Sequence, residues 1–200
     1  GRFNIVNNYY KPGPATTQTT AFLHPLRETS GGVVIYDYGK FFVSGNVLEN
    51  NSTVNQDNWK GVLLQSNADT QQHLDGTKLT SALPSEVYET THTAAIAYQR
   101  VLDNAGASLV RDPVDVRVVN ETRNRTFTFN GSNGSKQGII DSQDDAGGWP
   151  SLKNGTKPLD TDGDGLPDSF EIANTLDPLK ANDKEYNLGP YYTDIEVYIN

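Results

Sequence analysis

FNIVNNYY, residues 3–10, has a counterpart 38 residues later in FFVSGNVL, residues 41–48. Aligning the two segments pairs four positions: Phe3 with Phe41, Ile5 with Val43, Asn8 with Asn46, and Tyr9 with Val47. In a parallel β-helix each coil lays a short strand on the previous one, so apolar positions stack and an asparagine at a bend bonds its own kind. The repeat therefore predicts coils of such a solenoid over residues 1–66. An antiparallel sheet with Asn-Gly turns is the alternative that the residues alone leave open.

Residues 67–148 are predicted to wrap around these coils as loops and helices. Their first part, 67–90, is polar and contains a proline, which is typical of a loop. The hydrophobic period then becomes that of a helix, with Ile96, Tyr98, Val101, Leu102 and Ala105 on one face, and a second helix follows. The expected helix signals are Thr91 or Thr93 and Gly106 for the first helix, and Asp112 with Pro113 for the second.

DTDGDGLPDSFE, residues 160–171, has the pattern of a calcium loop. Ca²⁺ takes about six to eight oxygens, and a twelve-residue loop supplies them from positions 1, 3, 5, 7, 9 and 12 if a glycine at position 6 allows the turn. The ligand positions here hold Asp160, Asp162, Asp164, the Leu166 carbonyl, Asp168 and Glu171, with Gly165 as the sixth residue. The pattern predicts Ca²⁺ as a cofactor. The alternative, a solvated acidic loop, would leave these like charges in mutual repulsion.

The surroundings of this loop differ from those of a complete EF-hand. Pro150 and Pro158 exclude a helix directly before the loop, whereas DSFEIAN can form one after it. We therefore expect an EF-hand-like loop with an exiting helix only, which staples a C-terminal segment over residues 149–200. Thr193 is expected to cap a last helix. The residues before that helix lack the acids of a calcium loop, so a second ion is not expected.

The composition argues against several classes of function. The net charge is −9, with 25 acidic and 16 basic residues, which disfavours nucleic acid as a partner. The absence of cysteine excludes disulfides, thiol catalysis and zinc–thiolate sites. The longest apolar runs, such as GGVVIY, are far shorter than the roughly 20 residues that span a membrane. The chain begins at Gly1 and contains no methionine, so we expect a processed product or a fragment without a signal peptide.

Sequons of the form N-x-S/T occur more often than chance predicts. In a eukaryotic protein they would be glycan acceptors on a secreted surface, whereas in a bacterial protein they would only mark polar loops. Both interpretations stay open. The sequons begin at Asn50, Asn51, Asn120, Asn124, Asn130, Asn133 and Asn154.

The residues offer no complete set of acid, base and nucleophile, so no catalytic residue is assigned. His24, His73 and His92 are far apart and lie in no metal or nucleophile motif. Trp59 and Trp149 could stack on a sugar, but beside glycine and proline they are interpreted as buried anchors.

One segment of this acidic chain, residues 100–125, is rich in arginine. A guanidinium fork could bind sugar carboxylates there. Pairing of Arg111 and Arg117 with Asp112 and Asp115 on a helix surface is the simpler interpretation. The arginines concerned are Arg100, Arg111, Arg117, Arg123 and Arg125.

Several phrases in order now resemble a known family. They are GRFNIVNNYYKPGPAT, GKFFVSGNVLEN, DNW, AYQRVLDNAGASLVRDPVD, GIIDSQDDAGGWP, DTDGDGLPDSFE and YYTDIEVYIN. Together they resemble the C-terminal part of secreted pectate lyases of polysaccharide lyase family one, especially the Bacteroidetes type and the related fungal enzymes. The match runs across nearly all 200 residues.

The resemblance implies a mainly β chain that holds the final coils of a right-handed parallel β-helix and a C-terminal helical and looped extension. It implies cleavage of polygalacturonate by β-elimination, in which Ca²⁺ bridging enzyme and uronate acidifies the C5 proton and an arginine removes it. That arginine and the aspartates for the bridging ion are expected before Gly1, and Arg2 does not correspond to that arginine. Only the acidic loop carries over, at Asp160, Asp162, Asp164, Leu166 and Glu171.

The sequence therefore predicts the C-terminal portion of a secreted, calcium-dependent pectate lyase whose partner is the acidic polysaccharide pectate. The 200-residue chain by itself is expected to be inactive. The alternative is a non-catalytic extracellular structural or carbohydrate-binding protein with a lyase-like β-helix and a structural calcium site. In that case the open end of the β-helix could support self-assembly, because an uncapped coil can stack on a neighbour.

Overall fold

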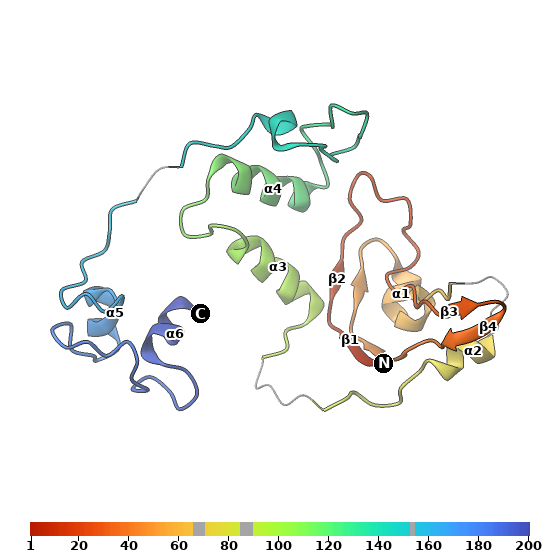
Figure 1. The fold of residues 1–200 in the computed structure, drawn as a ribbon, viewed down its shortest axis with the longest axis horizontal. Helices are drawn as coiled ribbons and strands as arrows, with labels where there is room; N and C mark the ends of the chain where they lie inside the picture. The colour runs from red at the N-terminus through yellow and green to blue at the C-terminus, as the bar shows by residue number, and fades with distance from the viewer. Residues whose placement is uncertain (66–70, 85–89, 153–154) are drawn as a thin grey trace. The chain divides into compact units, whose positions relative to one another are not determined.

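The computed structural model describes residues 1–65, 71–84, 90–152 and 155–200. They fall into two compact units, an N-terminal unit, Gly1–Ser151, and a C-terminal unit, Leu152–Asn200 (Figure 1). The strands are β1 (Arg2–Val6), β2 (Tyr9–Tyr10), β3 (Glu28–Ser30), β4 (Val33–Tyr36), β5 (Lys40–Ser44) and β6 (Val47–Leu48). The helices are α1 (Ser52–Gln56), η1 (Asn58–Gly61), α2 (Gln71–Gly76), α3 (Ala94–Asn104), α4 (Pro113–Asn124), η2 (Gln143–Ala146), α5 (Asp168–Ala173) and α6 (Asp194–Ile199). In the described part of the chain, no helix is long and apolar enough to cross a membrane.

Parallel pairing joins the two segments that repeat in the sequence. β1 pairs with β5 and β2 pairs with β6, in both cases at the predicted offset, which sets Phe3 opposite Phe41. The rings of these two residues stack with their centroids 5.4 Å apart. Asn46 Oδ1 accepts from the Asn8 side-chain amide at 3.1 Å and from the Asn8 backbone N–H at 3.0 Å. The parallel stacking and the asparagine contact are thus confirmed, and the antiparallel alternative is wrong for these four strands.

The stack has a third layer. The Phe41 N–H donates to the Thr77 carbonyl at 2.7 Å, and the Phe41 carbonyl accepts from the Leu79 N–H at 2.8 Å. Phe41 also forms a parallel bridge with Lys78. Stacking therefore extends to residues 77–79, past the limit at residue 66 that the sequence suggested.

A small apolar core lies among these layers. Its central residues are Phe41, Val43 and Val62, and five partly buried residues pack around them: Ile5, Phe22, Leu23, Trp59 and Leu74. The repeated segments supply Ile5, Phe41 and Val43 to this core, and the other residues come from the segments beside the paired strands.

The described residues contain more helix than strand, whereas the sequence predicted a mainly β chain. The sheets are two-stranded, and β3 and β4 form an antiparallel hairpin. Part of the excess helix comes from α1, η1 and α2, which occupy stretches predicted as strands or loop. Local caps explain two of these turns. Asn51 Oδ1 accepts from the Val54 N–H and Asp57 Oδ1 from the Trp59 N–H, each at 3.1 Å, and such contacts begin helices.

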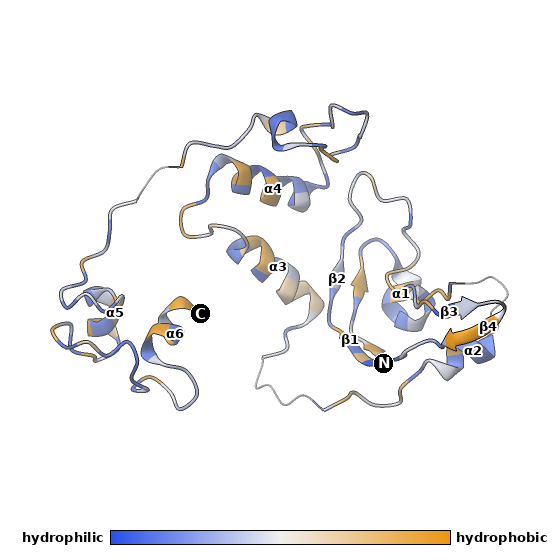
Figure 2. Cartoon of the chain, in the orientation of Figure 1, coloured by the Kyte–Doolittle hydropathy of each residue, from blue (hydrophilic) through white to orange (hydrophobic). Residues whose placement is uncertain are grey.

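β4 is apolar but lies on the surface. Figure 2 shows this strand in orange, and its residues Val33, Val34, Ile35 and Tyr36 are 67, 44, 52 and 67 % exposed. The β3–β4 hairpin therefore contributes little to the core.

The caps of α3 and α4 agree with the sequence prediction. Thr93 caps α3, and Asp112 caps α4 with proline at the first helical turn. Gly106 follows the last turn of α3 with a φ of 72°, a conformation that glycine adopts without strain. The predicted apolar face of α3 is only partly buried, because Leu102 is 3 % exposed but Val101 is 61 % exposed.

Candidate metal centre

The acidic segment of the C-terminal unit folds into a tight loop directly before α5. The Asp160 carboxylate accepts from the Gly163 N–H at 2.8 Å and from the Gly165 N–H at 3.3 Å. Gly165 has a φ of 100°, which agrees with its predicted role at the sharp turn. Asp164 Oδ1 accepts from the Leu166 N–H at 2.8 Å, so the backbone of the loop curls around its own carboxylates.

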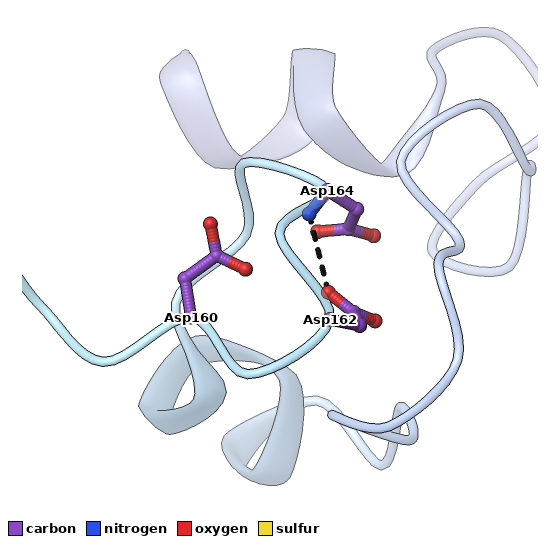
Figure 3. Close-up of side chains that lie close together, drawn as sticks. All are labelled: Asp160, Asp162 and Asp164. Carbon is purple, nitrogen blue, oxygen red and sulfur yellow. Dashed lines mark hydrogen bonds between the residues drawn. The ribbon is translucent and has the colours of Figure 1, made fainter.

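Three aspartates of this loop converge (Figure 3). Asp160, Asp162 and Asp164 each offer a carboxylate oxygen, and these oxygens lie within 4.8 Å of one another. Two oxygens bound to one Ca²⁺ at about 2.3–2.6 Å are at most about 5 Å apart. The spacing therefore fits coordination of one calcium ion by all three residues.

Two carboxylate oxygens at this site lack hydrogen-bond partners among the described residues. Asp162 Oδ2 and Glu171 Oε2 are buried and accept no hydrogen bond there. Burial raises the pKa of the Asp162 carboxyl, as do the charges of Asp164 and Asp160. Burial likewise raises the pKa of Glu171, and Asp162 and Asp164 add to the effect. Both ionised groups are thus disfavoured without a cation, which is the condition that a cation site requires.

Asp168 and Glu171 lie outside the cluster of three aspartates. Asp168 closes the loop, because its carboxylate accepts from the Thr161 N–H at 2.7 Å and from the Thr161 hydroxyl at 2.6 Å. The ninth position of such loops often reaches the ion through a water molecule, so this contact is compatible with a calcium site. Glu171 projects from α5 and is fully buried, as is the side chain of Leu166.

Sequence reasoning missed the segment that supports the loop from outside. Asp164 Oδ2 accepts from the backbone N–H groups of Asn182 and Asp183 at 2.8 and 3.0 Å. The Asn182 side-chain amide donates to Glu171 Oε1 at 3.1 Å. Asn182 is only 4 % exposed, and its Oδ1 accepts no hydrogen bond within the described structure. Because Asn182 follows the twelve-residue pattern, no spacing rule could have selected it.

The segment before α6 has a different arrangement. Asp194 is fully buried and accepts from the Leu188 N–H at 2.9 Å and from the Asn187 side-chain amide at 2.7 Å. Its carboxylate is therefore satisfied by its own loop. Thr193 begins α6 in a capping box with Glu196, as predicted for the last helix.

Two arginines of the arginine-rich segment, Arg111 and Arg117, have other partners than predicted. Arg111 Nη2 donates to the Leu102 carbonyl at 2.6 Å and so satisfies the end of α3. Arg117 pairs with Glu121 at 3.0 Å, one turn along α4. The predicted pairing of both arginines with Asp112 and Asp115 is wrong, because those aspartates accept backbone N–H groups instead.

The structure also shows the surroundings of the tryptophans and of most sequon asparagines. Trp59 is half-buried, with Lys78 Nζ 5.2 Å from its ring centroid, but Trp149 is 84 % exposed and is not a buried anchor. Asn51 caps α1 through its side-chain oxygen. Asn154 lies outside the described residues, and the remaining sequon asparagines are exposed: Asn50, Asn120, Asn124, Asn130 and Asn133.

Comparison with known proteins gives relatives over nearly the whole chain, although no family model matches it. The chain is 32 % identical over 193 residues to a "Probable pectate lyase C" of Emericella nidulans, which covers 96 % of the chain and 40 % of the relative. Proteins of the same name from Aspergillus terreus and Aspergillus fumigatus are 31 % identical over 197 and 199 residues, each covering 98 % of the chain and 41 % of the relative. The chain is therefore a homologue of these proteins and spans about two fifths of their length. The resemblance to pectate lyases is confirmed.

Proposed function

We propose that this chain is the C-terminal portion of a secreted, calcium-dependent pectate lyase. The observation that carries the proposal is the stacking of strands at a 38-residue offset in a homologue of proteins named pectate lyase. We further propose that the stacked layers are coils of a right-handed parallel β-helix. The third layer at residues 77–79 supports this fold, because a solenoid adds one layer for each repeat.

The acidic loop is proposed to hold a structural Ca²⁺ ion. Asp160, Asp162 and Asp164 would bind it directly, together with the Leu166 carbonyl and Glu171, and Asp168 would act through water. The ion supplies positive charge that offsets the repulsion among these carboxylates. Its proposed role is to fix α5 and the segment at Asn182 to the loop. It would take no part in the reaction on the sugar.

The reaction proposed for the whole protein is β-elimination, in which a base removes the C5 proton of a galacturonate residue and the bond to O4 breaks. We place the catalytic arginine outside this chain. Arg111 is engaged with the α3 carbonyls and Arg117 with Glu121, so neither is free to act as that base. We further propose that the chain alone binds calcium without cleaving pectate.

An activity assay tests this assignment. The chain is incubated with polygalacturonate and Ca²⁺, and the absorbance of the unsaturated product is followed. We expect no rise above the rate without protein. A clear rise would show that the base lies within these 200 residues and would contradict the proposed division of roles.

The extracellular location and the partner follow from the same proposal. Pectate is the substrate class that the relatives' name indicates, and the exposed sequons would suit a secreted protein. Self-assembly through the open side of β1 stays part of the non-catalytic alternative. Measurement of molar mass by light scattering tests it, since a monomer at high concentration would remove the basis for that alternative.

A further inference from the structure

A pocket of about 390 Å³ lies within the N-terminal unit, beside α4. Its walls are the turn after β2, at Lys11–Pro14, one side of α4, and the loop that follows this helix. We name it the α4 pocket. Its volume is in the range of small-molecule sites, at roughly 300–1,000 Å³, and suits one sugar ring better than a large cofactor.

The α4 pocket is positively charged in a chain whose net charge is −9. Lys11, Arg117 and Arg125 line it, and Glu121 is the one acidic residue among its lining residues. Lys11 is paired with Glu49 at 2.6 Å and Arg117 with Glu121 at 3.0 Å. The Arg125 side chain has no hydrogen-bond or ion-pair partner among the described residues. Arg125 is therefore the cation that is available to an anionic ligand.

The backbone fixes the position of Arg125. This residue ends α4 in the left-handed conformation, with φ 56° and ψ 46°, and its N–H donates to the Glu121 carbonyl. The Thr126 N–H donates to the same carbonyl at 3.1 Å. Because these hydrogen bonds close the helix end, the backbone of Arg125 is ordered before a ligand binds. Binding then has to order only the side chain, which lowers its entropic cost.

The other lining residues narrow the chemistry of the ligand. Thr122 and Thr126 line the pocket as well, so its wall offers groups that can hydrogen-bond the hydroxyls of a ligand. Pro12, Pro14 and Phe127 line the pocket with apolar surface, which suits the C–H face of a sugar ring. A carboxylate, hydroxyl groups and an apolar face occur together in a uronic acid.

We propose that the α4 pocket binds one uronate residue of an acidic polysaccharide, with the Arg125 guanidinium holding its carboxylate. The choice of galacturonate as the uronate rests on the proposed function. The site is separate from the acidic loop, and it would act as a subsite that retains the polysaccharide without taking part in bond cleavage.

The test is a chemical-shift titration of the isotopically labelled chain with D-galacturonate and with D-galactose, which differ by the carboxylate. We expect galacturonate to bind at least about tenfold more tightly, because a hydrogen bond to a charged group is the difference between them. Arg125→Gln should weaken galacturonate binding by about tenfold. Arg125→Lys should lose less affinity, because it keeps the charge but not the fork.

Arg123→Gln is the matched control, since Arg123 is an exposed arginine on the same helix that does not line the pocket. It should bind galacturonate like the wild type, and circular dichroism shows whether each variant is folded. Absence of galacturonate binding, equal binding of both sugars, or an Arg125→Gln variant that binds like the wild type would each overturn the proposal. None of these results would change the lyase assay, so the proposed function is judged separately.

Discussion

Glu171→Gln should have opposite effects on the two states of the C-terminal unit. The substitution keeps the shape of a fully buried side chain and removes its charge. Without Ca²⁺ the charge is unfavourable, because Glu171 is buried near three other carboxylates that raise its pKa. The variant should then be more stable than the wild type. With Ca²⁺ the charge is needed, because the carboxylate at the twelfth position is the bidentate ligand of such loops.

The magnitude follows from linkage. Loss of residues that only orient metal ligands costs about 10–100-fold in affinity, so loss of this ligand's charge should cost about 100-fold or more. At a Ca²⁺ concentration of 100 times the Kd, binding stabilises the wild type by about 2.7 kcal/mol. For a unit this small that corresponds to a rise in Tm of roughly 10 °C or more. A variant bound 100-fold more weakly should keep only about 0.4 kcal/mol of this stabilisation.

Calorimetry measures both quantities, with titration for the affinity and differential scanning for the Tm with Ca²⁺ and with EDTA. Glu185→Gln is the control, because it removes one charge from the same unit at an exposed residue outside the loop. It should respond to Ca²⁺ like the wild type. Equal calcium responses of wild type and Glu171→Gln, or a wild-type Tm that is the same in EDTA, would refute the reasoning.

Three further predictions concern the same two units. Asn182→Ala should weaken Ca²⁺ binding by about 10–100-fold in a calorimetric titration, because Asn182 orients Glu171. Asn46→Ala should lower the free energy of unfolding by about 2 kcal/mol in urea, because this buried amide contacts Asn8 and the Ile5 carbonyl. In EDTA, the C-terminal unit should lose stability as the pH rises from the ordinary pKa of a glutamate through the raised pKa of Glu171. The reason is that the folded state binds this proton more tightly than the unfolded state and loses it over that interval. Thermal melts across the acidic range measure this slope.

Each of these has a contrary outcome. A calcium affinity in Asn182→Ala equal to that of the wild type would mean that Asn182 supports the fold alone. An unchanged urea midpoint in Asn46→Ala would show that the asparagine contact between layers is dispensable. A Tm in EDTA that increases over the same pH interval would mean that Glu171 is stabilised as an anion by groups within the protein.

The parts of the fold that the sequence predicted are those fixed by local or periodic rules. The offset of the stacked strands is visible because each coil must repeat the apolar positions of the one below. Asp112 and Thr193 were predictable as caps because a cap contacts residues two or three positions away. Asn182 and Arg111 were not, since each contacts groups that the fold brings together and that no spacing rule relates.

The sequence overestimated the strand content for a related reason. Short apolar segments near glycine and asparagine suit a strand or a helical turn equally well, and local side-chain caps decided for helix at α1 and η1. In the acidic loop, too, some features could be predicted from the sequence and others could not. Its three convergent aspartates follow from the spacing, whereas the use of Asp168 to close the loop on Thr161 depends on the folded backbone.

Our central proposal is that this chain is part of a protein that cleaves pectate by elimination, and product analysis of the full-length protein tests this most directly. Polygalacturonate is digested with Ca²⁺ and with EDTA, and the products are analysed by ultraviolet absorbance and mass spectrometry. The account predicts oligogalacturonates with an unsaturated end, formed only when Ca²⁺ is present. Saturated oligogalacturonates, which result from hydrolysis, or no cleavage in Ca²⁺ would contradict it.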